Sequence, residues 1–241
     1  MPRTIEIETA DGICRAELHS PASPSTTGVI LYMDAFGPRP ALSTMAARLA
    51  EAGHYVLVPD LFYRFGAYGP FASDAFAHDE SRNALMRMIT TTTQAMTEAD
   101  SGAFIAALTA AGATGALATV GYCMGGGRAL VAAAAYPDRV KAALSFHGGN
   151  LASDSADAPV QRVYTIRCPV YIGQAGVDAS YPPEQSTRLA EALRIAGVDH
   201  VIENYVGMNH GWTVPDSLAY DARGAERHWK RLLTMLEETL G

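Results

Sequence analysis

Apolar and polar residues alternate in two short segments near the beginning of the sequence. The first runs from Ile5 to Glu8 and the second from Cys14 to Leu18, with Asp11-Gly12 between them. Alternation with a period of two is typical of strands that bury one face, and Asp-Gly is a preferred two-residue hairpin turn. The pattern therefore predicts an N-terminal antiparallel β-hairpin.

The next apolar segments are continuous rather than alternating. Gly28 to Met33 and Tyr55 to Val58 are uninterrupted apolar runs, as expected of strands buried on both faces. Between them, Leu42, Met45 and Leu49 recur at helical spacing. A strand, a helix and a second strand within about 30 residues form a βαβ unit, so we expect a largely parallel sheet.

Predicted strands and helices continue to alternate along the rest of the chain. This order predicts one α/β domain over residues 1–241, with a mostly parallel central sheet of about eight strands flanked by helices. The least regular segment, Leu61 to Thr97, contains one predicted helix over Asp79 to Met88, and we expect it to cover the functional site. The remaining predicted strands are Ala116–Val120, Ala142–Phe146, Val170–Gly173 and Val201–Tyr205. The remaining predicted helices are Phe104–Ala111, Gly125–Tyr136, Glu184–Ala196 and Leu218–Leu240.

A G-x-C-x-G pattern, Gly121-Tyr122-Cys123-Met124-Gly125, joins a predicted strand to an alanine-rich predicted helix. This arrangement predicts a nucleophile elbow, a sharp strand-to-helix turn that raises its central side chain. Small residues are needed on both sides because the two backbones approach closely. A thiol at the start of a helix lies in the positive end of the helix dipole, which favours the thiolate. The alternative is a tight glycine turn that holds a small buried cysteine.

The acid and the histidine of an elbow hydrolase follow the nucleophile in chain order, each beyond the end of a later strand. Asp178 comes five residues after Val170–Gly173, and His210 lies just beyond Val201–Tyr205. As a lone residue, Asp178 would instead be read as a loop or helix-capping aspartate. We therefore predict Cys123, His210 and Asp178 as the catalytic residues.

Other acids and histidines fit these roles less well. Asp199 precedes its strand, and Asp216 is expected to cap the last helix. His147 follows the strand Ala142–Phe146 at the same sheet edge but precedes Asp178, so we expect it either to line the pocket or to be structural. Of the remaining histidines, two begin strands (His54 and His200) and three occupy positions typical of a surface (His19, His78 and His228).

The oxyanion hole is expected to consist of backbone N–H groups alone. One donor is Met124, the residue after the nucleophile, and the other is Ala35 in the loop after the strand Gly28–Met33. Asp34 stands in the same loop, at the mouth of the predicted site, where a solvated loop acid is the alternative interpretation.

The composition excludes several other classes of protein. The chain has 241 residues, 49% hydrophobic and 18% charged, and a formal net charge of −7 with scattered basic residues, which argues against a nucleic-acid partner. No segment has the pattern of a signal peptide or a membrane span. The three cysteines are odd in number and far apart, which favours a reducing compartment, so we expect a cytoplasmic protein. Their spacing does not match a zinc site, so no bound metal is expected. Phosphate-loop and dinucleotide fingerprints are also missing, so no cofactor is expected.

The cysteine elbow, the acid and the histidine described above together resemble those of the dienelactone hydrolase family, which has the α/β-hydrolase fold. The resemblance implies that the Cys123, His210 and Asp178 triad opens esters or cyclic enol lactones through a thioester, without metal or cofactor. In the family an acidic residue, usually glutamate, stands where Asp34 does and touches the resting thiol. The strongest matching segments are Gly121–Gly126, Phe36-Gly37, Val58–Phe62, Asp178 and His210–Trp212. We expect the following residues to modulate the thiol or to line the pocket: Asp34, Phe36, Tyr122, His147 and Trp212.

The sequence departs from the family at the substrate end of the site. Well-known members bind a substrate carboxylate with arginines, one of them shortly after the catalytic histidine, whereas here Trp212-Thr213-Val214 follows and the next arginine is Arg223. Arg64 and Arg82, in the irregular segment, are the other candidate cations. The partner is thus expected to be a small ester or lactone, and the protein a monomer or homodimer. A general carboxylesterase or thioesterase, or a ligand-binding protein without turnover, remains an alternative.

Overall fold

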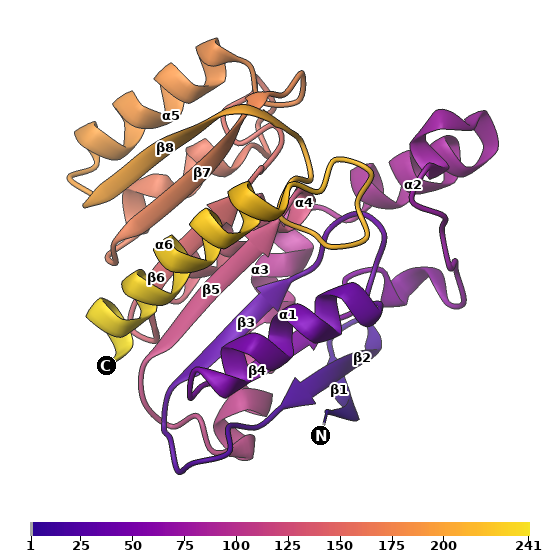
Figure 1. Ribbon diagram of the computed structural model, residues 1–241. Coiled ribbons are helices and arrows are strands. Elements are labelled where there is room, and N and C mark those ends of the chain that lie inside the picture. Colours follow the sequence, from indigo (N-terminus) through magenta and orange to yellow (C-terminus); the bar gives the residue numbers. More distant parts are fainter. Residues whose placement is uncertain (1) are drawn as a thin grey trace.

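An eight-stranded sheet forms the centre of the structure, a computed structural model that describes residues 2–241 (Figure 1). The strand order across the sheet is β1-β2-β4-β3-β5-β6-β7-β8. The strands are β1 (Arg3–Thr9), β2 (Gly12–His19), β3 (Gly28–Tyr32), β4 (Tyr55–Pro59), β5 (Leu117–Tyr122), β6 (Val140–Phe146), β7 (Val170–Val177) and β8 (His200–Asn209). The α-helices are α1 (Pro40–Glu51), α2 (Asp79–Thr91), α3 (Gln94–Ala111), α4 (Met124–Ala135), α5 (Pro183–Ile195) and α6 (Ala222–Leu240).

The pairing of the strands confirms both sequence predictions about the sheet. β1 and β2 form the antiparallel hairpin, and β2 also pairs antiparallel with β4. All pairs from β4 through β3 to β8 are parallel. The carboxyl ends of β3, β5, β7 and β8 therefore meet at one edge of the sheet, where the predicted site residues follow them.

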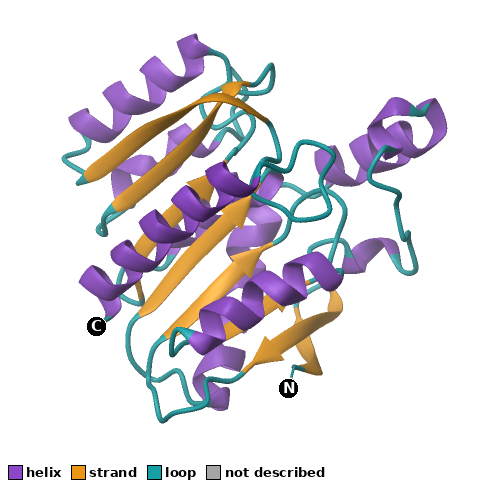
Figure 2. Cartoon of the chain, viewed as in Figure 1, coloured by secondary structure: helices purple, strands orange, loops and turns teal. Residues whose placement is uncertain are grey.

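Helices cover both faces of the sheet (Figure 2). α1 and α6 lie on the near face in Figure 1, and α3 and α4 lie behind it. The central parallel strands are buried on both faces; every residue of β3 and of β5 is buried, whereas most of β8 at the sheet edge is exposed or half-buried. This explains the continuous apolar runs in the sequence, because neither side chain direction leads to water.

Two predicted helix boundaries are wrong. α3 begins at Gln94, ten residues before the predicted start, and α6 begins at Ala222 rather than at Leu218. The predicted cap of the last helix is also wrong: Asp221 caps α6, because its side chain accepts a hydrogen bond from the N–H of Gly224 at 2.7 Å. Asp216 lies in the preceding loop and pairs with Arg39 instead.

The irregular segment between β4 and α3 lies against the loop that follows β3. It contains two short 3₁₀ helices, η1 (Tyr63–Phe65) and η2 (Ala75–Ala77), and then α2, which projects from the body of the molecule in Figure 1. The ring of Phe76 meets that of Phe36 edge to face, with centroids 5.5 Å apart. Gly37 has φ 82°, a conformation that favours glycine, and a Cβ there would lie 2.7 Å from the hydroxyl of Tyr68.

Two histidines predicted on the surface are buried. His19 is 4% exposed and His228 is fully buried. The Nδ1–H of His228 donates to the carbonyl of Ala225 at 3.0 Å, so Nε2 accepts from the hydroxyl of Tyr122 at 2.9 Å. Burial lowers the pKa of His228 from 6.5 to about 3, and the folded state therefore holds this ring neutral.

The buried histidines predict how stability depends on pH. Because the unfolded state binds a proton near pH 6.5 that folded His228 refuses down to about pH 3, stability should fall as the pH is lowered through this range, by about 1.4 kcal/mol per pH unit for each such group. Urea unfolding between pH 4 and 6.5 measures the slope. His228→Leu should reduce this slope by about 1.4 kcal/mol per pH unit, because one fewer proton is taken up on unfolding. The exposed control His78→Gln should leave the slope unchanged. An unchanged slope in His228→Leu would refute the conclusion that folded His228 stays neutral.

Candidate active site

Cys123 lies in the turn between β5 and α4, at the start of the helix. Its backbone has φ 56°, in the left-handed region that non-glycine residues rarely adopt. A Cβ at Gly121 would lie 1.9 Å from the carbonyl oxygen of Gly125, and a Cβ at Gly125 would lie 2.3 Å from that of Tyr32. Glycine is therefore required on both sides of Cys123, which has the geometry of a nucleophile elbow.

Asp178 and His210 come together at the ends of β7 and β8. The Nδ1–H of His210 donates to Oδ2 of Asp178 at 2.7 Å, and this carboxylate side chain is 3% exposed. The other oxygen of Asp178 accepts from the N–H and the hydroxyl of Ser180, at 2.8 and 2.6 Å. Burial alone would raise the pKa of Asp178, but the hydrogen bonds from His210 and Ser180 outweigh it and hold the pKa below its usual range.

His210 also interacts with Cys123. Burial lowers the pKa of His210, but the negative charge of a Cys123 thiolate and the hydrogen bond to Asp178 outweigh that and raise the pKa from 6.5 to about 10. Nδ1 of His210 is held by Asp178, so Nε2 is the atom left for the thiol. The structure thus brings together the three residues that the sequence predicts as a triad.

His147 supports the turn that carries Cys123. Its Nδ1 accepts a hydrogen bond from the backbone N–H of Cys123 at 3.1 Å, so its Nε2–H donates to the hydroxyl of Thr213 at 2.8 Å. The ring is 1% exposed and lies 5.0 Å from the ring of His210, measured between centroids. Burial and the nearby charge of His210 lower the pKa of His147 well below its usual range. A neutral ring with both nitrogens engaged fits the structural interpretation of this residue.

Tyr122 and Trp212, expected to modulate the thiol or to line the pocket, are fully buried. Tyr122 stacks on Phe146, with centroids 5.6 Å apart. Trp212 packs edge to face on His147 at 5.1 Å. Both side chains therefore lie beneath the site and support it, rather than form an open wall.

Two backbone N–H groups near the ends of β3 and β5 lack an internal hydrogen-bond partner. Met124 is the first residue of α4, so its N–H has no partner within the helix. Within residues 2–241, the N–H of Ala35 makes no hydrogen bond. These are the two groups that the sequence predicts as oxyanion donors.

Asp34 is directed toward Arg39. Its two carboxylate oxygens accept from Nη1 and Nη2 of Arg39 at 2.7 and 2.8 Å, and one of them also accepts from the N–H of Phe36 at 3.0 Å. Across residues 2–241, no hydrogen bond joins Asp34 to Cys123. The shorter side chain of aspartate is thus bound by an arginine instead of reaching the thiol.

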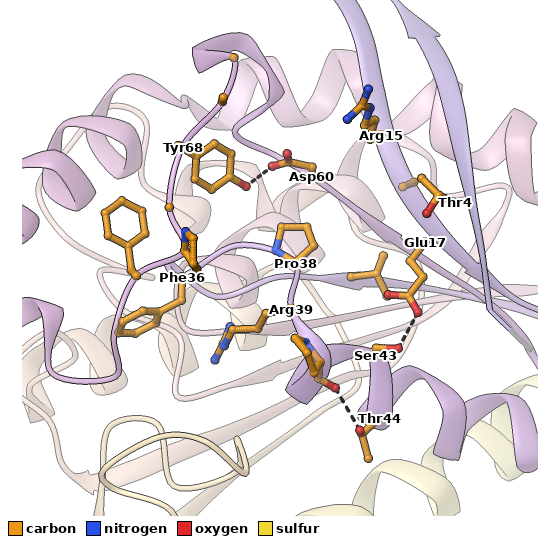
Figure 3. A pocket seen from close by; sticks show the side chains of 18 residues that line it. Thr4, Arg15, Glu17, Phe36, Pro38, Arg39, Ser43, Thr44, Asp60 and Tyr68 are labelled. Carbon is orange, nitrogen blue, oxygen red and sulfur yellow. Dashed lines mark hydrogen bonds between the residues drawn. The ribbon is translucent and has the colours of Figure 1, made fainter.

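An open hollow of about 750 Å³ lies beside this loop (Figure 3). Phe36, Pro38 and Arg39 line one part of it, and the hydrogen-bonded pair Tyr68 and Asp60 lines another. Cys123 and His210 are not among its lining residues. The hollow therefore adjoins the loop after β3 that contains Ala35, which we call the oxyanion loop. It adjoins this loop from the side of α1 and the irregular segment.

Comparison with known proteins identifies the family. The family model described as "Dienelactone hydrolase family" matches residues 14–240. The chain belongs to the dienelactone hydrolase family. It is a carboxylic-ester hydrolase by this membership, as the sequence analysis predicts.

Individual members of the family are only moderately similar in sequence. A putative carboxymethylenebutenolidase of Yersinia pestis is 29% identical over 208 residues, 85% of this chain and 75% of the relative. A carboxymethylenebutenolidase of Rhodococcus opacus is 29% identical over 222 residues, covering 88% and 81%. The crystal structure of a putative dienelactone hydrolase from Klebsiella pneumoniae has a TM-score of 0.87 at 23% identity, covering 98% of both chains. This last likeness confirms the α/β-hydrolase fold.

Both arginines that the sequence offers as partners for a substrate carboxylate, Arg64 and Arg82, are paired with acids. Arg64 donates to Asp100 at 2.8 and 2.9 Å and to Asp11 at 2.6 and 2.9 Å. Arg82 pairs with Asp79 on α2. Neither guanidinium is therefore free to bind a substrate carboxylate without losing an existing partner.

Sequence reasoning missed three residues that contact the predicted ones: Ser180, Thr213 and Arg39. Ser180 was recognisable, because an aspartate followed two residues later by serine is typical of a turn closed by the side chain. Thr213 and Arg39 bond to groups far away in the sequence, so no local signal marks them.

For other types of site the structure offers no support. Within residues 2–241, no three His, Cys, Asp or Glu side chains are grouped so as to hold a metal ion. In the same residues, no helix has the length and apolarity needed to cross a membrane.

Proposed function

We propose that the protein hydrolyses esters or enol lactones with Cys123 as the nucleophile, through a thioester intermediate. The observation that carries this proposal is the grouping of Asp178, His210 and Cys123 at the carboxyl edge of the sheet, where the N–H groups of Met124 and Ala35 have no hydrogen-bond partner. Each part has a defined place in acyl transfer.

In the acylation step the thiolate of Cys123 attacks the carbonyl carbon of the substrate. A C–S bond forms, and the carbonyl electron pair moves to the oxygen, which the N–H groups of Met124 and Ala35 stabilise. Collapse of this intermediate breaks the bond to the leaving oxygen, which takes the proton from Nε2 of His210. In a lactone the leaving oxygen stays attached to the acyl group.

Deacylation reverses these roles with water. His210, now neutral, accepts a proton as water attacks the thioester carbon, and the C–S bond breaks to give the acid and the thiolate. Asp178 keeps Nδ1 of His210 protonated and stabilises the imidazolium throughout. No step requires a metal or a cofactor.

The substrate that we propose is neutral. A buried carboxylate without an opposing cation costs several kcal/mol, and Arg39, Arg64 and Arg82 are all engaged by acids. Aromatic side chains of the irregular segment, such as Phe76, approach the oxyanion loop at Phe36. This lining suits an acyl or lactone group that is partly apolar.

A substrate comparison tests this charge preference. Neutral short-chain aryl esters and simple lactones should have a higher kcat/KM than a dienelactone with a free carboxylate, at one ionic strength and with each substrate below KM. A preference of more than about tenfold for the carboxylated lactone, equal to about 1.4 kcal/mol, would contradict the prediction and would implicate Arg64 or Arg82 as an anion site.

Turnover of a chromogenic ester panel tests the function itself. Hydrolysis that disappears in Cys123→Ala supports the proposal. A broad preference for simple acyl esters or thioesters over lactones would favour a general carboxylesterase or thioesterase. Tight ligand binding with no turnover would favour a non-catalytic binding protein and refute the proposal.

We also propose that residues 1–241 act as one domain in a reducing, cytoplasmic setting. One sheet runs through all parts of the chain from Arg3 to Asn209, and the three cysteines are free thiols. A disulfide in the native protein would contradict the proposed location.

A further inference from the structure

The guanidinium of Arg39 uses all five of its N–H donors. Nη1 donates to Oδ1 of Asp34 at 2.7 Å and to the carbonyl of Gly37 at 3.2 Å. Nη2 donates to Oδ2 of Asp34 at 2.8 Å and to Oδ1 of Asp216 at 2.9 Å, and Nε donates to Oδ2 of Asp216 at 2.7 Å. Arg39 thus holds two carboxylates, each with two hydrogen bonds.

The two acids belong to different loops of the site. Asp34 and Gly37 lie in the loop after β3, which contains the predicted oxyanion donor Ala35. Asp216 lies in the loop that begins at His210, 177 residues from Arg39 in the sequence. Arg39 therefore connects the loop of the oxyanion donor with the loop of the catalytic base.

The environment of Arg39 favours a fixed connection over a free anion site. Its side chain is 17% exposed, and its guanidinium lies 5.3 Å from the centre of the Phe36 ring. In Figure 3 it lies next to Phe36 and Pro38 at the edge of the hollow. With two carboxylates around one cation, the cluster has a net negative charge and repels a further anion.

We propose that Arg39 is a positioning residue that holds the N–H of Ala35 and the imidazole of His210 at the correct separation across Cys123. The inference rests on the proposed function. Acyl transfer needs both groups at the reacting carbon at once, and a misplacement of about 1 Å costs about 10²-fold in rate. Lysine cannot replace Arg39, because an ammonium lacks the planar pair of donors that each carboxylate accepts here.

Arg39→Met and Arg39→Lys test the proposal on a neutral aryl ester. For Arg39→Met we expect kcat to fall by about 10²-fold, with KM changed by less than about threefold, since the residue acts on the transition state. Arg39→Lys should rescue only part of the loss. The matched control is Arg48→Met: Arg48 lies on α1 and pairs doubly with Glu226 of α6, at 2.7 and 3.0 Å, and neither residue belongs to the loops after β3 and β8. Its kcat should stay within about twofold of wild type.

Asp216→Asn tests whether Arg39 acts by connecting the two loops or only by stabilising the fold. Arg39→Met and Asp216→Asn should each lower kcat, and the double variant should be no slower than Arg39→Met, because both changes remove the same connection. All assays are run well below each variant's Tm. Alkylation of Cys123 by iodoacetamide should continue in every variant, since it needs no oxyanion donor.

Three results would overturn the proposal. The first is a normal kcat in folded Arg39→Met, which would leave Arg39 a role in stability alone. The second is a rise in KM confined to carboxylated substrates, which would make Arg39 a ligand contact. The third is multiplicative loss in the double variant. Turnover by Cys123→Ala would instead refute the proposed function, so the two failures are distinguishable.

Discussion

Alanine in place of Cys123 is expected to reduce kcat for ester hydrolysis by about 10³-fold or more, because the remaining oxyanion donors and binding contacts cannot form a covalent intermediate. The matched controls are Cys14→Ala and Cys168→Ala, which should keep wild-type turnover when folded. Turnover by Cys123→Ala at more than a tenth of the wild-type rate would exclude Cys123 as the nucleophile.

The same prediction extends to chemical labelling. Iodoacetamide at neutral pH should modify Cys123 first and abolish activity. Cys14 is fully buried and Cys168 is 4% exposed, and burial raises the pKa of Cys14 to about 12 and that of Cys168 to about 11. Both should therefore react slowly. Equal labelling of Cys14, or full activity after modification of Cys123, would contradict the assignment.

His210→Ala should lower kcat by about 10³-fold or more, and Asp178→Asn by a similar or smaller factor, because the triad residues act as a unit. Asparagine keeps the shape of Asp178 but removes the charge that stabilises the His210 imidazolium. Combining either change with Cys123→Ala should cause little further loss. Steady-state kinetics with one neutral aryl ester measures all of these variants.

The control for the acid is Asp199→Asn, because Asp199 is an exposed residue just before β8. Wild-type rates for Asp178→Asn together with a loss in Asp199→Asn would show that the wrong acid has been chosen. His210→Ala should also slow alkylation of Cys123 at pH 7, since it removes the cation beside the thiolate. Unchanged alkylation would separate His210 from the thiol.

The sheet and the elbow were predictable because their signals are local. An Asp-Gly turn between alternating segments specifies the hairpin, and continuous apolar runs specify buried parallel strands. The elbow was predictable because close backbone contact at Gly121 and Gly125 excludes any side chain. Asp178 and His210 followed from chain order, since parallel strands bring their carboxyl ends to one edge.

The errors lie where distant residues determine the local structure. The first turns of α3 bury Thr97, Asp100 and Ser101, which interrupts the apolar periodicity that marks a helix. These polar groups are tolerated because Arg64 pairs with Asp100, and Ser101 hydrogen-bonds the hydroxyl of Tyr32 at 2.6 Å. Neither partner is close in the sequence, so a single segment cannot reveal the helix.

Asp216 illustrates the same limit, whereas the error at His228 does not. Asp216 follows a proline and has the local features of a helix cap, yet Arg39 binds it from the far end of the chain. The burial of His228 was recognisable, because it begins a series at a spacing of four residues with Leu232, Leu236 and Leu240, all buried in α6.

Trapping of the acyl-enzyme tests the central claim most directly. The enzyme is mixed with excess p-nitrophenyl ester, quenched in acid within milliseconds to seconds, digested, and analysed by mass spectrometry. The account predicts one acyl group on the peptide that contains Cys123, formed as fast as nitrophenol is released, absent in Cys123→Ala, and removed by neutral hydroxylamine as a thioester should be. Turnover with the acyl group on another residue, or with no adduct even when His210→Ala slows deacylation, would contradict a cysteine-dependent mechanism.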